Sequence, residues 1–107
     1  MAAKLWEQRD RFGNSIYLTD ERWRHIVDPD NHPEVEAHAE LISATLREGR
    51  LRQGPLDPQA WQYYQPFGDL PDGNTHMVVC VRLRIVDDAE GESHEERFVT
   101  TAYFQLF

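Results

Sequence analysis

Histidine and arginine side chains gather in the run TDERWRHIVDPDNHPEVEAH, residues 19–38. Metal-independent cleavage of RNA uses such groups. One must take the proton of the 2′-hydroxyl and another must protonate the leaving 5′-oxygen, and histidine suits both near neutral pH. Arginine stabilises charge on the reacting phosphate through its planar guanidinium group. His25, with Arg22 and Arg24 beside it, is therefore the strongest candidate for an acid–base group.

Two further histidines follow, and prolines separate them from His25. His32 directly precedes Pro33, at the predicted start of a second helix, so a structural role there competes with a contact to substrate. His38 is expected to face solvent from that helix.

Side chains that suit RNA also occur later in the chain. The candidates for contacting its phosphates and bases are Arg47, Arg50, Arg52, Tyr63, Tyr64, Thr101 and Tyr103. On a strand, neighbouring side chains point to opposite faces, so at most one of Tyr63 and Tyr64 can line a site. The same alternation puts Thr101 and Tyr103 on one face, away from Thr100. The three arginines have an alternative role, which is to balance acidic residues and the end of a helix.

Other chemistries lack their motifs in this chain. No two histidines have the i, i+3 or i, i+4 spacing of common zinc-binding helices. The single cysteine, Cys80, allows no intrachain disulfide and no cysteine-based zinc site. It lies in the apolar run MVVCVRLRIV, where we expect a small buried hydrophobic residue. The sequence holds neither a nucleophile elbow nor a phosphate loop, and we expect no metal and no other cofactor.

The composition indicates one globular domain spanning residues 1–107. Hydrophobic residues make up 40% of the chain, which is too many for a disordered segment. The formal net charge of −8 argues mildly against sequence-blind binding of nucleic acids, which uses a basic surface. No apolar stretch has the length of a signal peptide or a membrane span, so we expect a cytoplasmic protein without a membrane partner.

The elements that position these side chains can be predicted from local patterns. The run LWEQRDRFGNSIYLT predicts a β-hairpin that turns at Gly13 and Asn14. Thr19 is typical of a helix N-cap, and Pro29 ends the short helix that follows. A second helix is expected from Pro33 to about residue 47.

Four strand candidates follow the second predicted helix, at residues 50–56, 61–67, 75–86 and 97–107. Residues 87–93, DDAEGES, are expected to form the loop of a hairpin between the last two. The sequence therefore predicts an α+β fold, in which an N-terminal β-hairpin and two helices pack on a roughly four-stranded antiparallel sheet.

Several short motifs resemble those of a known superfamily. They are IYLTDERWRHI, then HPE, a helix with ATL, the pair YY, a valine-rich strand and a final FVTTAY. Together these motifs, from about residue 12 to the end, resemble the phage- and prophage-associated nuclease-like domains of the barnase–EndoU–colicin–RelE (BECR) superfamily. The resemblance implies a RelE-like ribonuclease fold. It implies acid–base roles for His25 and His32 and a phosphate contact for Thr101.

Two functions follow as hypotheses. The first is a toxin-like, metal-independent endoribonuclease, whose partners are RNA and an antitoxin or immunity-type protein. Its catalytic residues would be His25, Arg24 and Thr101. Its substrate-binding residues would be Arg22, His32, Arg47, Tyr63, Tyr64 and Tyr103. The second is an inactive interaction module of phage or mobile-element origin. In either case the last strand could pair with a second copy to form a homodimer.

Overall fold

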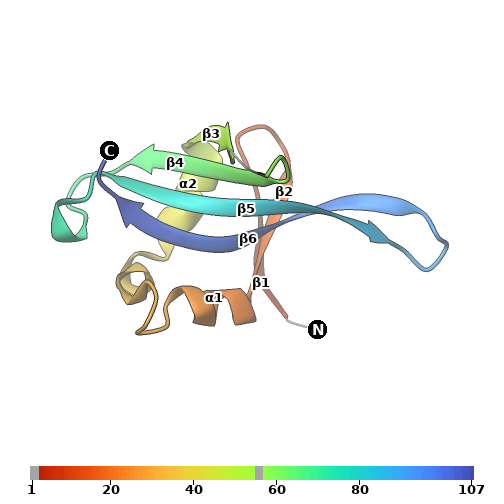
Figure 1. Ribbon diagram of the computed structural model, residues 1–107, viewed down its shortest axis with the longest axis horizontal. Helices are drawn as coiled ribbons and strands as arrows, with labels where there is room; N and C mark the ends of the chain where they lie inside the picture. The colour runs from red at the N-terminus through yellow and green to blue at the C-terminus, as the bar shows by residue number, and fades with distance from the viewer. Residues whose placement is uncertain (1–2, 55–56) are drawn as a thin grey trace.

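The computed structural model describes residues 3–54 and 57–107 as one six-stranded sheet with helices packed against it (Figure 1). The strands are β1 (Lys4–Arg9), β2 (Ser15–Thr19), β3 (Arg50–Gln53), β4 (Ala60–Pro66), β5 (His76–Asp87) and β6 (Ser93–Gln105). The helices are α1 (Asp20–Ile26) and α2 (Glu40–Glu48), with short 3₁₀ helices η1 (Pro33–His38) and η2 (Pro71–Gly73). The strand predicted at 50–56 is observed as β3, and positions 55 and 56 lie outside the described residues.

The predicted α+β fold class is confirmed. The sheet has six strands where roughly four were predicted, and the N-terminal hairpin is part of the sheet instead of packing on it. The sheet order is β1-β2-β6-β5-β4-β3, and β2 pairs with β6 in parallel at Ile16–Arg97 and Tyr17–Phe98. Ile16 and Leu18 of β2 belong to the same hydrophobic core as the other strands. The pairing of β2 with β6 therefore adds the hairpin to that core. Local alternation shows which side chains point inward, but it does not show which strand edge a hairpin joins.

The core lies on one face of the sheet, between the strands and the helices α1, η1 and α2. Its buried residues are Ile16, Leu18, Ile26, Val35, Ile42, Leu46, Tyr63, Met77, Val79, Val81, Val99, Ala102 and Phe104. Along β5 the inward side chains alternate, so Val78 and Cys80 point to the other face. No helix of the described chain is long and apolar enough to span a membrane.

The N-terminal elements follow local rules. The turn of the predicted hairpin contains Gly13 at a φ of +86°, and β1 and β2 pair antiparallel around it. The Thr19 hydroxyl accepts a hydrogen bond from the Arg22 amide at 3.1 Å, which confirms the predicted N-cap. The second predicted helix is divided at Ala39 into η1 and α2. Bonds of the i→i+3 type, such as the one from the Val35 amide to the His32 carbonyl, tighten this segment.

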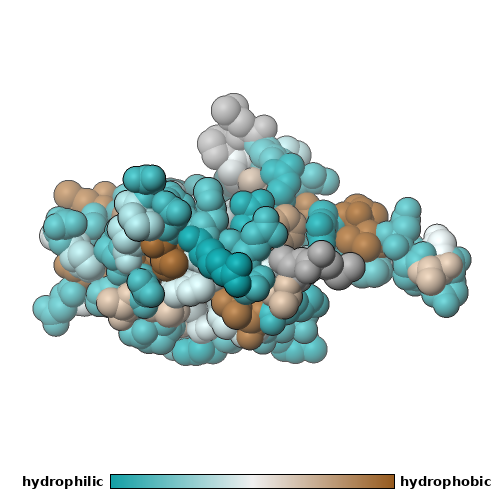
Figure 2. Space-filling view, turned by 90° about the horizontal axis from the view of Figure 1, so that it is seen from below, coloured by the Kyte–Doolittle hydropathy of each residue, from teal (hydrophilic) through white to brown (hydrophobic). Residues whose placement is uncertain are grey.

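β5 and β6 extend beyond the rest of the sheet as a two-stranded arm, residues 83–96 (Figure 1). Neither neighbour follows them, because β4 pairs only as far as Arg82 and β2 only as far as Arg97. Six of the nineteen acidic residues and none of the eleven Lys and Arg lie between 85 and 96, so this segment carries six of the eight net negative charges. Figure 2 shows hydrophobic side chains partway along the arm and mostly hydrophilic ones at its end.

Gly49 closes α2 where the helix meets β4. A Cβ at this position would lie 2.4 Å from the Thr45 carbonyl oxygen and 2.9 Å from that of Tyr64. Gly49→Ala is therefore expected to lower the free energy of unfolding by about 1–3 kcal/mol, measured by urea denaturation. Gly68→Ala is the matched control, since its Cβ would meet nothing within 4 Å. Equal stability of the two variants would contradict this close approach.

A buried carboxylate joins the N-terminal hairpin to β4. Asp10 accepts hydrogen bonds from the Tyr63 hydroxyl at 2.5 Å and from the amides of Phe12 and Asn14 at 2.9 and 2.7 Å. Burial tends to raise the pKa of Asp10, but these hydrogen bonds outweigh it, and the pKa lies below its usual value. Burial and the hydrogen bond to Asp10 raise the pKa of Tyr63.

Tyr63→Phe is expected to cost about 1–3 kcal/mol of stability at neutral pH, because it removes one donor from a buried carboxylate. Since the pKa of Asp10 is lowered on folding, this contribution is present above the unfolded value of 3.8 and is lost as the pH falls through the lower folded value. The stability difference from wild type should therefore shrink between pH 6 and pH 3. Tyr64→Phe is the control, and a difference that did not change with pH would contradict the role of Asp10.

Candidate functional site

The face of the sheet away from the core carries three rows of side chains that are neighbours across strands. The first row is Arg50, Tyr64, Val78 and Tyr103. The second row is Arg52, Gln62, Cys80 and Thr101. The third row is Pro66, His76 and Gln105. Since the described helices α1, η1 and α2 pack against the core side, we call this other side the outer face. It gathers arginine, tyrosine, histidine and threonine from four strands.

Two tyrosines form the centre of the outer face. Tyr64 and Tyr103 stand on either side of Val78, which is fully buried although it points away from the core. Burial raises the pKa of Tyr103, and the neighbouring Cys80 raises it further, while Arg52 partly offsets both. The Tyr103 hydroxyl therefore stays protonated at neutral pH and can donate a hydrogen bond or a proton.

Cys80 is half-buried on the outer face, and is not the buried hydrophobic residue that the apolar run predicted. The strand alternation that buries Met77 and Val79 turns its thiol outward. Burial raises the pKa of Cys80, and a weak hydrogen bond from Gln62, with 3.9 Å between Nε2 and Sγ, offsets this only in part. The protonated thiol is a poor nucleophile, so any catalytic group on this face must be another side chain.

Arg52 and three rings make an aromatic cluster beside the tyrosines. The Arg52 guanidinium lies 5.3 Å from the centroid of the Tyr64 ring and 5.6 Å from that of Phe107. The rings of His76 and Phe107 stack at 3.9 Å with an angle of 10° between their planes. Arg52 also donates to Gln62 at 2.7 Å, which fixes its position on the face. The positive charge of Arg52 tends to lower the pKa of both Tyr103 and Cys80.

His32 reaches the outer face from the edge of β6. Its ring lies 5.5 Å from that of Tyr103, at an angle of 30°. Its Nδ1 lies 3.6 Å from a carboxylate oxygen of Glu34, which leaves Nε2 as the nitrogen able to meet a substrate. Although His32 stands at the N-cap position of η1, its side chain makes no capping hydrogen bond. The His32 ring therefore has one contact on each side, with Tyr103 on the outer face and with Glu34 of η1.

Four of the predicted site residues, His32, Tyr64, Thr101 and Tyr103, thus share one surface. Tyr63 was predicted to bind substrate, and this was wrong, because its side chain is 2% exposed in the core and bonded to Asp10. The expected opposition of Tyr63 and Tyr64 is confirmed by their burial. The expected pairing of Thr101 with Tyr103 on one face is confirmed by the register of β5 and β6.

The residues predicted on the helices lie apart from this group. His25 is exposed on α1, and its backbone carbonyl accepts a hydrogen bond from the Asn31 side chain at 2.8 Å. Within residues 3–54 and 57–107, no hydrogen bond or ion pair joins the His25 ring to another side chain. Arg24 is paired with Asp20 at 3.3 Å, and Arg22 is exposed on the same helix.

Two more predictions on the helices concern Arg47 and His38. Arg47 is exposed on α2, which packs on the core side of the sheet, so it cannot share the outer face with Thr101. His38 was expected to face solvent. Instead it is half-buried, with its ring edge-on to that of Phe104 at 5.4 Å.

The sequence did not identify His76 as a site residue. It left two roles open for Arg50 and Arg52, which were contact with RNA and the balance of acidic residues. The alternation in RLRQ, WQYYQP and HMVVC could have shown that Arg52, Tyr64 and His76 share a face, given the correct register. That register is a property of the strand pairing, which the single sequence does not fix. The described residues contain no group of three or more His, Cys, Asp or Glu placed to hold a metal ion.

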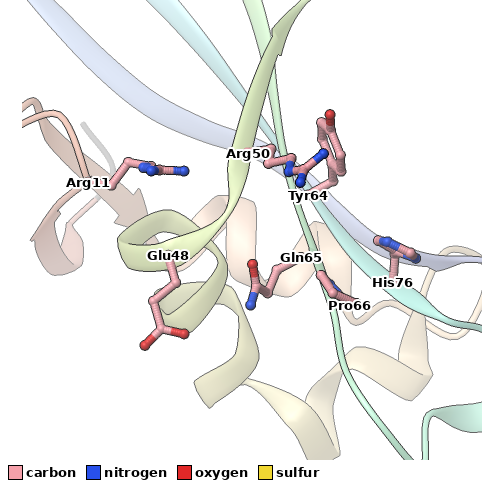
Figure 3. Close-up of a pocket in the computed structure, with 7 residues that line it drawn as sticks. All are labelled: Arg11, Glu48, Arg50, Tyr64, Gln65, Pro66 and His76. Carbon is pink, nitrogen blue, oxygen red and sulfur yellow. The ribbon is translucent and has the colours of Figure 1, made fainter.

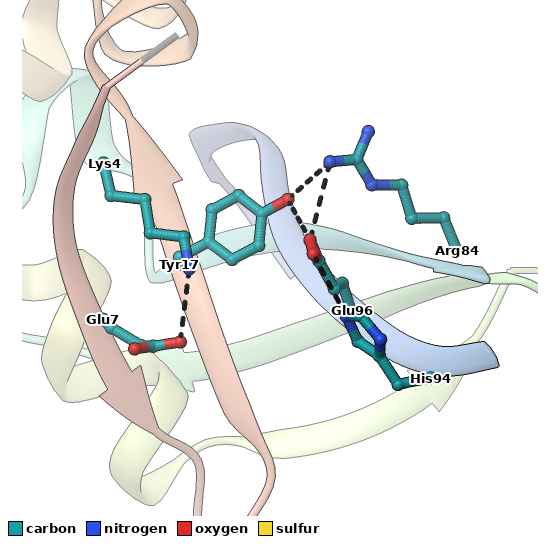
Figure 4. Close-up of polar contacts among 6 residues, drawn as sticks. All are labelled: Lys4, Glu7, Tyr17, Arg84, His94 and Glu96. Atoms are coloured by element: carbon teal, nitrogen blue, oxygen red, sulfur yellow. Dashed lines mark hydrogen bonds and ion pairs between the residues drawn. The ribbon is translucent and has the colours of Figure 1, made fainter. Parts of the chain in front are cut away.

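A separate polar network lies at the base of the arm (Figure 4). Its members are Lys4, Glu7, Tyr17, Arg84, His94 and Glu96. The Tyr17 hydroxyl accepts a hydrogen bond from Arg84 at 2.9 Å and donates one to Glu96 at 3.2 Å, and Arg84 and Glu96 form an ion pair at 3.6 Å. His94 lies 3.8 Å from Glu96. Because these charges satisfy one another, the network holds the arm against β2 and offers little to a ligand.

Comparisons with known proteins add no assignment. No family model matches the chain, and neither a curated protein nor a solved structure matches it.

Proposed function

We propose that this protein is a metal-independent endoribonuclease that cleaves RNA through attack of the 2′-hydroxyl on the adjacent phosphate. One observation carries the proposal. The outer face brings together His32, Arg52, Thr101 and Tyr103, which are the types of group that this reaction needs. The motifs that resemble the BECR superfamily support the same reaction class and a toxin-like role with an antitoxin or immunity-type partner.

His32 is the proposed general base. Its Nε2 takes the proton of the 2′-hydroxyl while the oxygen of that group bonds to phosphorus. The Glu34 carboxylate, 3.6 Å from Nδ1, orients the ring and stabilises the imidazolium that forms. The acid–base role that the sequence favoured for His25 on α1 is therefore assigned to His32, whose ring lies beside Tyr103 of β6.

Tyr103, Arg52 and Thr101 act on the phosphate and the leaving group. The protonated Tyr103 hydroxyl gives its proton to the 5′-oxygen as the bond from phosphorus to that oxygen breaks. The guanidinium of Arg52 stabilises the negative charge on the pentavalent phosphate, and the Thr101 hydroxyl adds a hydrogen-bond donor. The products are a 2′,3′-cyclic phosphate and a 5′-hydroxyl, and solvent then takes the proton from His32 and supplies one to Tyr103, which restores both groups.

The net charge of −8 is compatible with an RNA substrate because of where the charge lies. The arm segment 85–96 holds six of the eight net negative charges, so the rest of the chain has a net charge of only −2. Arg50 and Arg52 stand on the outer face, where a phosphate backbone would approach. The overall charge therefore does not describe the surface that would meet the nucleic acid.

The arm favours a second candidate function, an inactive module that binds another protein. It projects from the body (Figure 1), and Ile85, in the acidic segment 85–96, is 56% exposed. Such a module would need neither His32 nor Arg52 for its function.

Cleavage of RNA decides between the two functions. The purified protein with EDTA should cut a single-stranded RNA of mixed sequence, and mass spectrometry should find 2′,3′-cyclic phosphates on the products. RNA that stays intact over a wide range of protein concentration would leave only the interaction module.

A further inference from the structure

We infer that a cleft beside the aromatic cluster binds a nucleotide of single-stranded RNA next to the cleaved phosphate. The cleft has a volume of about 450 Å³, and the side chains that line it include Arg11, Arg50, Tyr64 and His76 (Figure 3). This inference rests on the proposed function for the identity of the substrate, and it assigns a separate subsite to residues that the cleavage step does not use.

Two arginines make the cleft suitable for a phosphate. Arg11 from the β1–β2 turn and Arg50 from β3 both line the cleft, with Arg50 beside Tyr64, while the carboxylate of Glu48 points away from both arginines (Figure 3). Neither guanidinium forms an ion pair with any residue in the described part of the chain. Two guanidinium groups without a carboxylate partner on the wall of one cleft favour the binding of an anion there.

Part of the wall of the cleft is aromatic. Tyr64 and His76 line it, with their ring centroids 6.4 Å apart, and Phe107 stacks behind His76 at 3.9 Å. A nucleobase can stack on such rings because every base has a π face. The cleft thus pairs a phosphate-binding wall with a base-stacking wall, which is the composition of a nucleotide subsite.

The subsite favours single strands over duplexes. In a duplex the bases are stacked on one another, and their faces cannot reach a tyrosine on a flat sheet. A single strand can turn a base onto Tyr64 while its phosphate meets Arg50, two residues that are direct neighbours across β3 and β4. From this cleft the strand continues along the first row toward Tyr103, where cleavage is proposed.

The probe for this subsite is a fluorescein-labelled DNA strand of eight nucleotides. It lacks the 2′-hydroxyl, so binding is measured without cleavage, by fluorescence anisotropy at several salt concentrations. Arg50→Gln should weaken binding and reduce the slope of log K against log salt by about one. Tyr64→Leu should weaken binding about fivefold or more through the loss of stacking. Arg22→Gln, on α1 and outside the cleft, is the matched control and should bind like wild type. Thermal melting shows that each variant is folded.

The inference is overturned if folded Arg50→Gln and Tyr64→Leu both bind like wild type, or if an eight-base-pair duplex binds as tightly as the single strand. This outcome is separable from failure of the proposed function. If the protein cleaves RNA but neither substitution changes binding, the nucleotide site in the cleft is wrong and the nuclease function stands. If both substitutions weaken binding but the protein cleaves no RNA, the cleft is a binding site for single strands and the nuclease function is wrong.

Discussion

His32→Ala is expected to lower the rate of RNA cleavage by about 10²–10⁴-fold, because it removes the general base that takes the 2′-hydroxyl proton. The ring of His32 packs against Tyr103 from the edge of β6 and makes no capping bond to η1, so its loss should leave the fold intact. Single-turnover cleavage of a labelled RNA measures the effect, and circular dichroism checks the fold.

Two other histidines serve as controls for this prediction. His94→Ala, on the arm, should cleave like wild type. His25→Ala should also retain most of the activity, although the two arginines just before His25 made it the first candidate in the sequence. If His25→Ala abolished cleavage while His32→Ala did not, the catalytic base would lie on α1 and the proposed geometry would be wrong.

Arg52→Gln is expected to lower the rate of cleavage by about 10²–10³-fold, the usual effect of losing one group that stabilises transition-state charge. Glutamine keeps a polar side chain beside Gln62 but removes the charge that acts on Tyr103. The main loss should be in the rate of the chemical step, measured at saturating RNA, and less in the affinity for RNA.

Arg82→Gln is the matched control for Arg52. Arg82 also points to the outer face, beside Cys80 on β5, but it is paired with Asp57 at 2.5 Å and does not take part in the proposed step. Its removal should change the rate less than threefold or so, within the range of a surface charge at some distance. A larger loss for Arg82→Gln than for Arg52→Gln would place the phosphate at the other end of the face.

Local structure could be predicted well from the sequence because its causes are local. The Thr19 cap depends on a hydroxyl three residues from an unpaired amide, and the turn at Gly13 depends on a backbone angle that glycine adopts freely. Strand alternation likewise separated Tyr63 from Tyr64 and joined Thr101 to Tyr103. These relations require no knowledge of the partners across the sheet.

The rest depends on contacts between distant parts of the chain. The parallel pairing of β2 with β6 joins residues about 80 positions apart, and no local pattern specifies it. For the same reason the sequence emphasised His25, which has arginines beside it along the chain. The structure joins His32 to Tyr103, which lies about 70 positions later. The role of Arg52 could not be decided from the sequence for the same reason, since only its pairing with Gln62 across β3 and β4 places it on the outer face.

The most direct test of attack by a 2′-hydroxyl uses a DNA strand that contains one ribonucleotide. The protein in EDTA should cut this strand only after the ribonucleotide, leaving a 2′,3′-cyclic phosphate, and an all-DNA strand of the same sequence should stay intact. Cleavage of the all-DNA strand, or a linear phosphate formed directly at the ribonucleotide, would contradict the proposed reaction.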